Sequence, residues 1–440
     1  MAERSEAIEE QAVRDASAAY AVEPEIATAE DVPPGYKRTE VGVIPEDWET
    51  VALGEGVSLL SGHHVMASFC NTTGHGVPYL TGPADFPDGY IQQTRFTTKP
   101  TTICEAGDLL LTVKGSGAGT LVKSDADYCI SRQLMAIHVE KWDPDFTFYS
   151  LLENASTLSD AVTGLIPGLS RGDVLSQVLP IPTEEKEQRA IATALSDADA
   201  LIESLDRLIA KKRAIKQAAM QQLLTGQIRL PGFTGEWETT QLGNVASFHK
   251  GSGLSKADLL VDGSSPCIHY GELFTQYGER ITSVNSRTDR KAACFKSIEN
   301  DVLMPTSDVT PNGLATASCI AESNVILGGD ILIIRPNGAE IDGTFLAYKI
   351  RMDHRQIMQL VSGTTVFHIY GRDMAEFTYK APTTEEQQAI VSVLSDMDTE
   401  IEALKPRRDK ACQIKQGMMQ HLLTGRVRLV EEDREDASHG

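Results

Sequence analysis

The sequence predicts an α+β protein. Two mixed, mainly β domains are separated by two long helices that pair as an antiparallel coiled coil, in an internally duplicated chain with a pseudo-twofold arrangement. Three observations predict this fold class. Residues 187–230 match residues 386–429 position by position without a gap. Both matched segments carry a heptad pattern of apolar residues, and the segments before them are rich in Gly, Thr and short apolar runs. A repeated unit of this kind determines the later assignments.

Each matched segment is expected to form one long helix with an apolar seam. The apolar positions step by four and three residues, which is the spacing of a helix that packs against a partner helix. Over 187–224 the first helix would be about 57 Å long at 1.5 Å per residue. Two seams at equivalent points of a duplicated chain are expected to pair antiparallel, and a charge at Leu195 or Leu394 should disrupt the assembly while leaving each globular domain folded. The seam consists of Ile191, Leu195, Ala198, Ile202, Leu205 and Ile209 in the first helix and Ile390, Leu394, Met397, Ile401 and Leu404 in the second.

Capping residues mark the ends of these helices. Thr183, followed by the charged run 184–187, supplies an N-cap and an acidic first turn, which suits the positive end of the helix dipole. Thr225-Gly226 and the matching Thr424-Gly425 supply the C-terminal stops. The second helix contains Pro406, which is expected to kink or divide it because proline lacks a backbone N–H.

The segments before the helices are expected to be mainly β. Short apolar runs at 108–113, 134–139 and 325–336 are separated by turn residues and do not alternate with helical patterns. A weaker match between the segments that begin at Trp48 and Trp237 extends the duplication. The expected division is an acidic tail (1–34), a first domain (35–180), a central helical segment (181–230), a second domain (231–380), a C-terminal helical segment (381–430) and a second acidic tail (431–440).

The chain is acidic, with 40 Lys+Arg against 62 Asp+Glu and a net charge of −22. This balance argues against a simple nucleic-acid-binding protein, which normally has a basic surface. Half of the net charge, however, lies in the tails: residues 1–34 hold nine acids and two bases, and residues 431–440 hold five acids and one base. Both tails are expected to be disordered. The rest of the charge is spread thinly enough to leave room for a local basic face.

The sequence shows no catalytic or metal-binding motif. It lacks a phosphate loop, a His-Glu-x-x-His zinc motif and a Gly-x-Ser-x-Gly nucleophile motif. It also lacks the box of Asp, Asn or Ser, then Pro-Pro, then Tyr, Phe or Trp, with which amino-methyltransferases hold the target base. Seven scattered cysteines are expected to be buried free thiols, and no metal site is expected. The Gly-rich stretch 114–120 is either a tight β turn or a loop that approaches a phosphate. No apolar run is long enough to span a membrane, so a cytoplasmic protein without membrane contact is expected.

Side chains suited to DNA are frequent in both globular segments. Arg and Lys reach phosphates and guanine edges, and Gln pairs with adenine. Solvated surface charge remains the alternative reading of any one of them. The candidate DNA-binding residues are Gln92, Arg95, Lys99, Lys114, Ser116, Lys123, Arg132 and Arg171 in the first segment and Lys250, Arg287, Arg290, Lys291, His368, Tyr370 and Arg372 in the second.

The opening motif and the repeated helix ends carry a family resemblance. Residues 35–48 read GYKRTEVGVIPEDW, and both helices end in Leu-Leu-Thr-Gly. These motifs, and the order of variable domain, helix, variable domain and helix, closely resemble the specificity (S) subunit of type I restriction-modification systems. The resemblance covers residues 35–429 and neither tail.

The resemblance implies a non-catalytic subunit that recognises DNA for host defence. Each globular segment would be a target recognition domain that reads one half of a bipartite, asymmetric site in double-stranded DNA. The helices would set the spacing of the two halves and dock two methyltransferase (M) subunits. The cofactors S-adenosylmethionine, ATP and Mg²⁺ would bind the M subunits and the restriction (R) subunits. The chain's acidity then implies that its partners supply much of the phosphate neutralisation.

The resemblance also points to particular turns. Members of the family carry the turn after a Gly-Asp-Leu-Leu strand toward the DNA. Here this turn corresponds to Lys114, Gly115, Ser116 and Gly117 in the first domain and to Thr306 and Ser307 in the second.

Two alternatives from other classes remain open on the sequence alone. One is a self-contained restriction or modification enzyme, which the missing methyltransferase and nucleotide motifs disfavour. The other is a coiled-coil scaffold with two β modules that bind protein or carbohydrate. A selection of bound sequences from a randomised DNA duplex library would separate the scaffold from a DNA reader.

Overall fold

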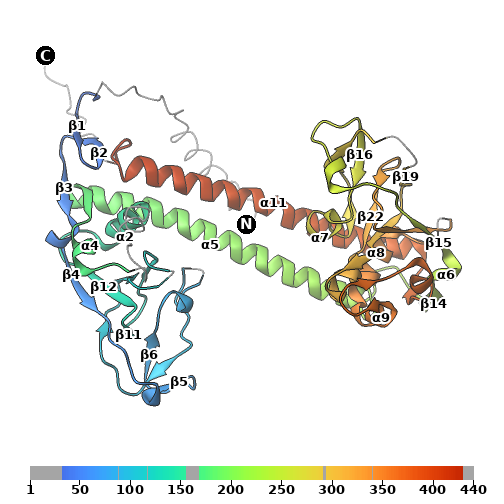
Figure 1. Cartoon of the computed structure of the whole chain (residues 1–440), viewed down its shortest axis with the longest axis horizontal. Coiled ribbons are helices and arrows are strands. Elements are labelled where there is room, and N and C mark those ends of the chain that lie inside the picture. The colour runs from blue at the N-terminus through green and yellow to red at the C-terminus, as the bar shows by residue number, and fades with distance from the viewer. Residues whose placement is uncertain are drawn as a thin grey trace. The chain divides into compact units, whose positions relative to one another are not determined.

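The computed structural model describes residues 32–87, 89–115, 117–154, 168–290, 294–338 and 340–429 (Figure 1). The chain divides into two compact units. Unit 1 comprises residues 1–206 and 406–440, and unit 2 comprises residues 207–405. Each unit contains one globular segment and part of both long helices. The borders between units therefore fall inside the helices, whereas the expected domain borders lay near residues 180, 230 and 380.

The two long helices are α5 (Glu185–Leu223) and α11 (Thr384–Leu422), each of 39 residues. Pro406 lies inside α11, so the expectation that it divides the second helix is wrong. Proline removes one backbone hydrogen bond, and the remaining bonds of the helix carry α11 across that position. Both helices stop at the expected glycines: Gly226 has a φ of 71° and Gly425 a φ of 68°. Glycine adopts this left-handed conformation without the strain that a side chain would cause.

Within unit 1 the parts of α5 and α11 run antiparallel. Lys415 Nζ of α11 lies 2.6 Å from Asp199 Oδ1 of α5, and Arg408 Nε lies 3.1 Å from Asp206 Oδ1. Residue numbers rise along one helix as they fall along the other, which is the expected antiparallel direction. The hydroxyl of Tyr149 donates a 2.8 Å hydrogen bond to Asp199 and so ties the globular segment to this pair.

Unit 2 repeats this arrangement with the roles of the helices exchanged. Lys216 Nζ of α5 lies 2.6 Å from Asp398 Oδ1 of α11, and Lys212 Nζ lies 2.5 Å from Glu400 Oε2. Tyr348 donates to Asp398 over 3.0 Å. Each unit therefore holds the same Tyr–Asp–Lys set at equivalent positions of the repeat.

The main sheet of unit 1 is buried on both faces. Its strand order is β10-β9-β12-β4, and every neighbouring pair is antiparallel. Leu109 and Leu111 on one face join a core with residues of α5 and α11, and Leu110 on the other face packs against the second sheet. Burial on both faces explains the three consecutive leucines, Leu109 to Leu111. The strands are β4 (Val57–Ser61), β9 (Leu109–Thr112), β10 (Leu121–Lys123) and β12 (Leu134–Val139).

The main sheet of unit 2 has the same topology. The order β22-β20-β24-β15 corresponds to β10-β9-β12-β4, with a further strand β17 at the edge. Both faces are again buried: Val302 and Met304 pack toward the helices, and Leu303 packs toward the second sheet. The strands are β15 (Ala246–Lys250), β17 (Arg280–Ile281), β20 (Val302–Pro305), β22 (Ser318–Ile320) and β24 (Ile331–Pro336).

The second sheets of the two units also correspond. Unit 1 has the order β5-β7-β6-β11-β8 and unit 2 the order β18-β16-β23-β19, and the pairs β6–β11 and β16–β23 are both parallel. The duplication thus extends into the globular segments, where the sequence match is weak. The strands are β5 (Cys70–Asn71), β6 (Val77–Leu80), β7 (Phe96–Thr97), β8 (Ile103–Cys104), β11 (Tyr128–Ile130), β16 (Ser265–Ile268), β18 (Ser286–Thr288), β19 (Phe295–Lys296) and β23 (Ile326–Leu327).

Small sheets and short helices complete the two units. The further strands are β1 (Tyr36–Thr39), β2 (Gly42–Pro45), β3 (Trp48–Ala52), β13 (Val178–Pro182), β14 (Glu238–Gln241), β21 (Ser307–Asp308), β25 (Ser362–Gly363), β26 (Phe367–His368) and β27 (Thr378–Ala381). The further α helices are α2 (Pro144–Glu153), α4 (Arg171–Leu175), α6 (Leu242–Val245), α7 (Glu272–Thr275), α8 (Gly343–Met352), α9 (His354–Leu360) and α10 (Gly371–Met374). Among the described residues, no helix combines the length and the apolar character that a membrane crossing needs.

The seam residues have two roles. Leu195 and Leu394 are fully buried and belong to the cores that also hold the main sheets. A charge at either position would therefore disrupt a globular core, and the expectation that it leaves the domains folded does not agree with the packing. Of the others, Ile191, Leu205, Ile209, Ile390, Ile401 and Leu404 are buried, and Ala198, Ile202 and Met397 are half-buried.

Candidate nucleic-acid interface

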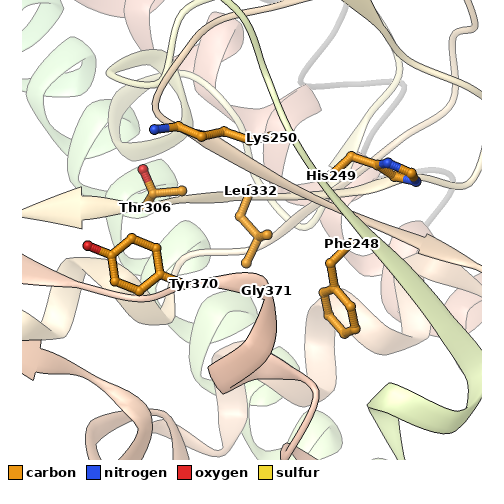
Figure 2. A pocket seen from close by; sticks show the side chains of 7 residues that line it. All are labelled: Phe248, His249, Lys250, Thr306, Leu332, Tyr370 and Gly371. Atoms are coloured by element: carbon orange, nitrogen blue, oxygen red, sulfur yellow. The ribbon is translucent and has the colours of Figure 1, made fainter.

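A small pocket lies on unit 2 where neighbouring strands end. Lys250 is the last residue of β15, Thr306 follows β20, and Tyr370 immediately precedes α10. Strands β15 and β20 flank β24 in the main sheet, which brings their ends together. Figure 2 shows the polar ends of Lys250, Thr306 and Tyr370 on one side of the pocket, whereas His249 points away from them. The pocket has a volume of about 190 Å³ and is lined by Phe248, His249, Lys250, Thr306, Leu332, Tyr370 and Gly371.

Three planar groups are stacked beside this pocket. The rings of His368 and Tyr370 lie 6.0 Å apart and are inclined by only 12°. The guanidinium carbon of Arg372 lies 5.5 Å from the centre of the Tyr370 ring, within the range of a cation–π contact. The side chain of Arg372 is 82% exposed and Tyr370 is 42% exposed. The stack therefore presents a cation and aromatic surface to solvent.

Backbone hydrogen bonds hold these side chains in place. His368 of β26 pairs with Ser307 of β21, the N–H of Ile369 donates to the Thr306 carbonyl over 3.1 Å, and the N–H of Thr306 donates to the Asp330 carbonyl over 2.9 Å. Lys250 Nζ lies 3.7 Å from a carboxylate oxygen of Asp330. Because both side chains are at least half exposed, this ion pair is weak and leaves the ammonium group available to an anion.

The arginines of the second sheet have structural partners. Arg287 donates from Nε to the Gly263 carbonyl over 2.5 Å and from Nη2 to the Ser264 carbonyl over 3.2 Å. Arg290 Nη1 lies 2.9 Å from Asp258 Oδ2. Hydrogen bonds from Ser255, and then Arg290, lower the pKa of Asp258. These two arginines hold a loop together, and Lys291 lies outside the described residues.

The Gly-rich stretch of unit 1 lies between β9 and β10. Lys114 forms a β bridge with Gly168, and Gly115 has a φ of 91°. A side chain at Gly117 would begin 2.6 Å from the Pro83 ring, so glycine is needed there for close approach. Lys114 is exposed, and Ser116 lies outside the described residues.

Comparison with known proteins identifies the family of the two globular segments and the helices. Residues 45–211 and 234–410 each match the model of the type I restriction modification DNA specificity domain. The chain belongs to this family. The two matches repeat the duplication seen in the helices and in the sheet topology.

Relatives and solved structures agree with the family match. The chain is 34% identical over 200 residues to a putative type I restriction enzyme MjaX specificity subunit of Methanocaldococcus jannaschii, an overlap of 44% of this chain and 47% of the relative. It is 23% identical over 406 residues to the MjaVIII specificity subunit of the same organism, covering 88% of this chain and 94% of that protein. The fold matches the crystal structure of the S subunit from M. genitalium with a TM-score of 0.60 and 16% identity, covering 91% of this chain and 99% of the other.

These findings confirm the expected family and fold class. The chain is a specificity subunit of a type I restriction-modification system, a component that recognises DNA and does not carry the catalysis. Family membership implies DNA and the methyltransferase and restriction subunits as partners. It decides against both the self-contained enzyme and the coiled-coil scaffold. Among the described residues, no group of three His, Cys, Asp or Glu side chains is placed to hold a metal ion.

The other candidate residues of the first specificity domain do not gather at one place through described contacts. Arg171 donates from Nη1 to the Leu59 carbonyl over 3.0 Å, Lys123 pairs with Asp145, and Lys99 lies 5.1 Å from the Phe69 ring centre. Gln92, Arg95 and Arg132 have exposed side chains.

The two specificity domains place different side chains at equivalent sites. Lys114 bridges Gly168 in the first domain, and Ser307 pairs with His368 in the second. In the first domain Ser170 precedes α4, and in the second Tyr370 precedes α10. The sequence predicts the first equivalence. Asp173 and Asp373, which accept from the N–H groups of Ser170 and Tyr370, mark the second.

Proposed function

We propose that each specificity domain reads one half of a bipartite, asymmetric site in double-stranded DNA. The observation that carries this proposal is the combination of one topology with two sets of loop side chains. The first domain presents Lys114 and Ser170 where the second presents Ser307 and Tyr370. Side chains of different hydrogen-bonding character select different base edges, so two such domains select different half-sites.

We further propose that α5 and α11 set the spacing of the two half-sites and dock two methyltransferase subunits. In each unit, segments of both helices are tied to the globular core through buried leucines and a Tyr–Asp–Lys set. A recognition domain fixed to the helices in this way has a fixed register on the duplex. S-adenosylmethionine would bind the methyltransferase subunits, and ATP and Mg²⁺ would serve the restriction subunits.

A domain exchange tests the reading of half-sites. Residues 231–380 are replaced by the corresponding segment of a relative, and the full chain, assembled with its methyltransferase subunits, is presented with a randomised duplex library. Sequencing of bound duplexes should return a bipartite motif in which only one half has changed. A change in both halves, or a contiguous motif, would contradict the proposal.

A further inference from the structure

Tyr370 occupies a position where the local structure favours a different residue. In the first domain the equivalent Ser170 caps α4: its hydroxyl accepts a 3.1 Å hydrogen bond from the N–H of Asp173. Serine is among the preferred N-cap residues because its short side chain reaches these N–H groups. Tyr370 makes no side-chain cap, and the start of α10 relies on the Asp373 carboxylate, which accepts from the N–H of Tyr370 over 3.0 Å. The tyrosine therefore does not serve the helix.

Burial does not explain the tyrosine either. The residue is 42% exposed, and its ring is stacked on His368 and covered in part by the exposed Arg372. Neither the Tyr370 hydroxyl nor the Thr306 hydroxyl makes a hydrogen bond to another side chain or backbone group in the described part of the chain. Both hydroxyls face the same side of the pocket, together with the Lys250 ammonium (Figure 2). A residue that breaks a local preference without a packing gain marks a functional position.

The size of the pocket limits what it can take. A volume of about 190 Å³ is below the roughly 300–1,000 Å³ of pockets that enclose cofactors and other small ligands. The edge of a base with the neighbouring phosphate fits such a space better than a whole ligand. Hydroxyl groups donate to and accept from base edges, and a lysine ammonium binds phosphate as a point charge.

We propose that Tyr370 determines specificity in the second half-site. Its hydroxyl and that of Thr306 bind one base edge, Lys250 binds the adjacent phosphate, and the stack of His368 and Arg372 holds the tyrosine ring in position. This inference rests on the proposed function, because it assigns a reading role within a domain that reads one half-site.

The test compares three variants with the wild type, each as the full chain assembled with its methyltransferase subunits. Tyr370→Ser introduces the residue of the first domain and restores a side-chain cap, and Tyr370→Phe keeps the ring and removes the hydroxyl. Lys250→Gln removes the phosphate contact. Binding is measured first by selection from a randomised duplex library and then with the selected duplex and its single-base-pair variants at several salt concentrations.

We expect both Tyr370 variants to lose discrimination at one base pair of one half-site, by about tenfold to a hundredfold, with the other half-site unchanged. Lys250→Gln should weaken binding to all duplexes alike and reduce the salt slope by about 1. Unchanged half-site preference in both Tyr370 variants, or a uniform loss of affinity for all duplexes, would overturn the inference. The proposed function would still stand if the wild type selected a bipartite motif. If the wild type itself selects no bipartite motif, the proposed function fails and the inference fails with it.

Discussion

Single arginines join parts of each unit that are distant in sequence. Arg428 makes a bidentate contact with Glu187, from Nε over 2.6 Å and from Nη2 over 2.8 Å. It also donates from Nη2 to Asp47 over 2.7 Å, and this hydrogen bond lowers the pKa of Asp47. Arg229 makes the equivalent bidentate contact with Glu386 in unit 2. Both glutamates are almost fully buried, so each needs its arginine. The repeat in the sequence contained these four residues at matching positions, but only the folded chain shows that they are partners.

Lys349 shows how the two copies differ at one residue. It is buried, and its ammonium donates to the Leu224 carbonyl at the end of α5 over 2.9 Å. Cations are favoured at the C-terminal end of a helix, although burial penalises the charge and lowers the pKa of Lys349. The equivalent residue in unit 1 is Ser150, whose buried hydroxyl has no hydrogen-bond partner in the described part of the chain.

This burial predicts a pH-dependent stability. Between the lowered pKa of Lys349 and its ordinary value of 10.5, the unfolded chain holds a proton that the folded chain has lost. Stability therefore rises with pH through this window, by at most about 1.4 kcal/mol per pH unit. In Lys349→Met this gain should be absent when urea unfolding is followed between about pH 8 and pH 10. Lys380→Met, at an exposed position of β27, is the control and should keep the wild-type slope; equal slopes in all three proteins would contradict the prediction.

The two long helices have segregated charges. Residues 185–206 of α5 carry six acids and two bases, and residues 207–223 carry five bases and no acid. In α11, residues 384–405 carry six acids and one base, and residues 406–422 carry four bases and one acid. This distribution complements each helix dipole. Within each unit it also sets an acidic segment against a basic one, whereas parallel pairing would set like charges together.

A charge exchange between the helices tests this arrangement. Lys212→Glu and Glu400→Lys should each lower the free energy of unfolding, and the double variant should recover most of the loss because the ion pair is restored with its charges reversed. For an exposed pair the coupling should be about 0.2–1 kcal/mol, and it should shrink at about 1 M salt. Urea unfolding of the wild type, both single variants and the double variant measures it. Simple addition of the two single losses would show that the pair does not contribute.

Elements were predictable from the sequence where local patterns are strong. Heptads and glycine stops predicted α5 and α11 to within a few residues, and apolar runs such as 108–113 predicted buried strands. Strand partners were not predictable, because β9 pairs with β12 and β10 through contacts that no local pattern records. Pro406 does not divide the second helix, because the packing of α11 outweighs the loss of one hydrogen bond.

At the scale of the whole molecule, one topology is used twice with different loops. The sequence predicted the duplication, and its polar side chains with donor capacity made Lys250, His368, Tyr370 and Arg372 candidates for DNA binding. It did not separate these from Arg287, whose donors are committed to a loop. Distinguishing the residues at the pocket from Arg287 requires knowing which strand ends lie together, and the fold determines this.

The net charge of −22 predicts how the affinity of the chain for DNA changes when its partner subunits bind. Residues 35–180 carry nine bases against seventeen acids, and residues 231–380 carry thirteen against seventeen, so neither domain neutralises many phosphates alone. Each neutralised phosphate contributes about −0.9 to the slope of log K against log salt. The chain alone should therefore bind its selected duplex more weakly, and with a shallower slope, than the chain assembled with methyltransferase subunits.

Titration of one labelled duplex at several salt concentrations measures both quantities, and a duplex with both half-sites scrambled controls for non-specific binding. If the partners supply phosphate contacts only, the two affinities should converge at high salt, while the preference for the selected duplex stays with the specificity subunit. Equal affinities and equal slopes for the lone chain and the assembly would mean that a basic face within this acidic chain supplies the phosphate contacts by itself.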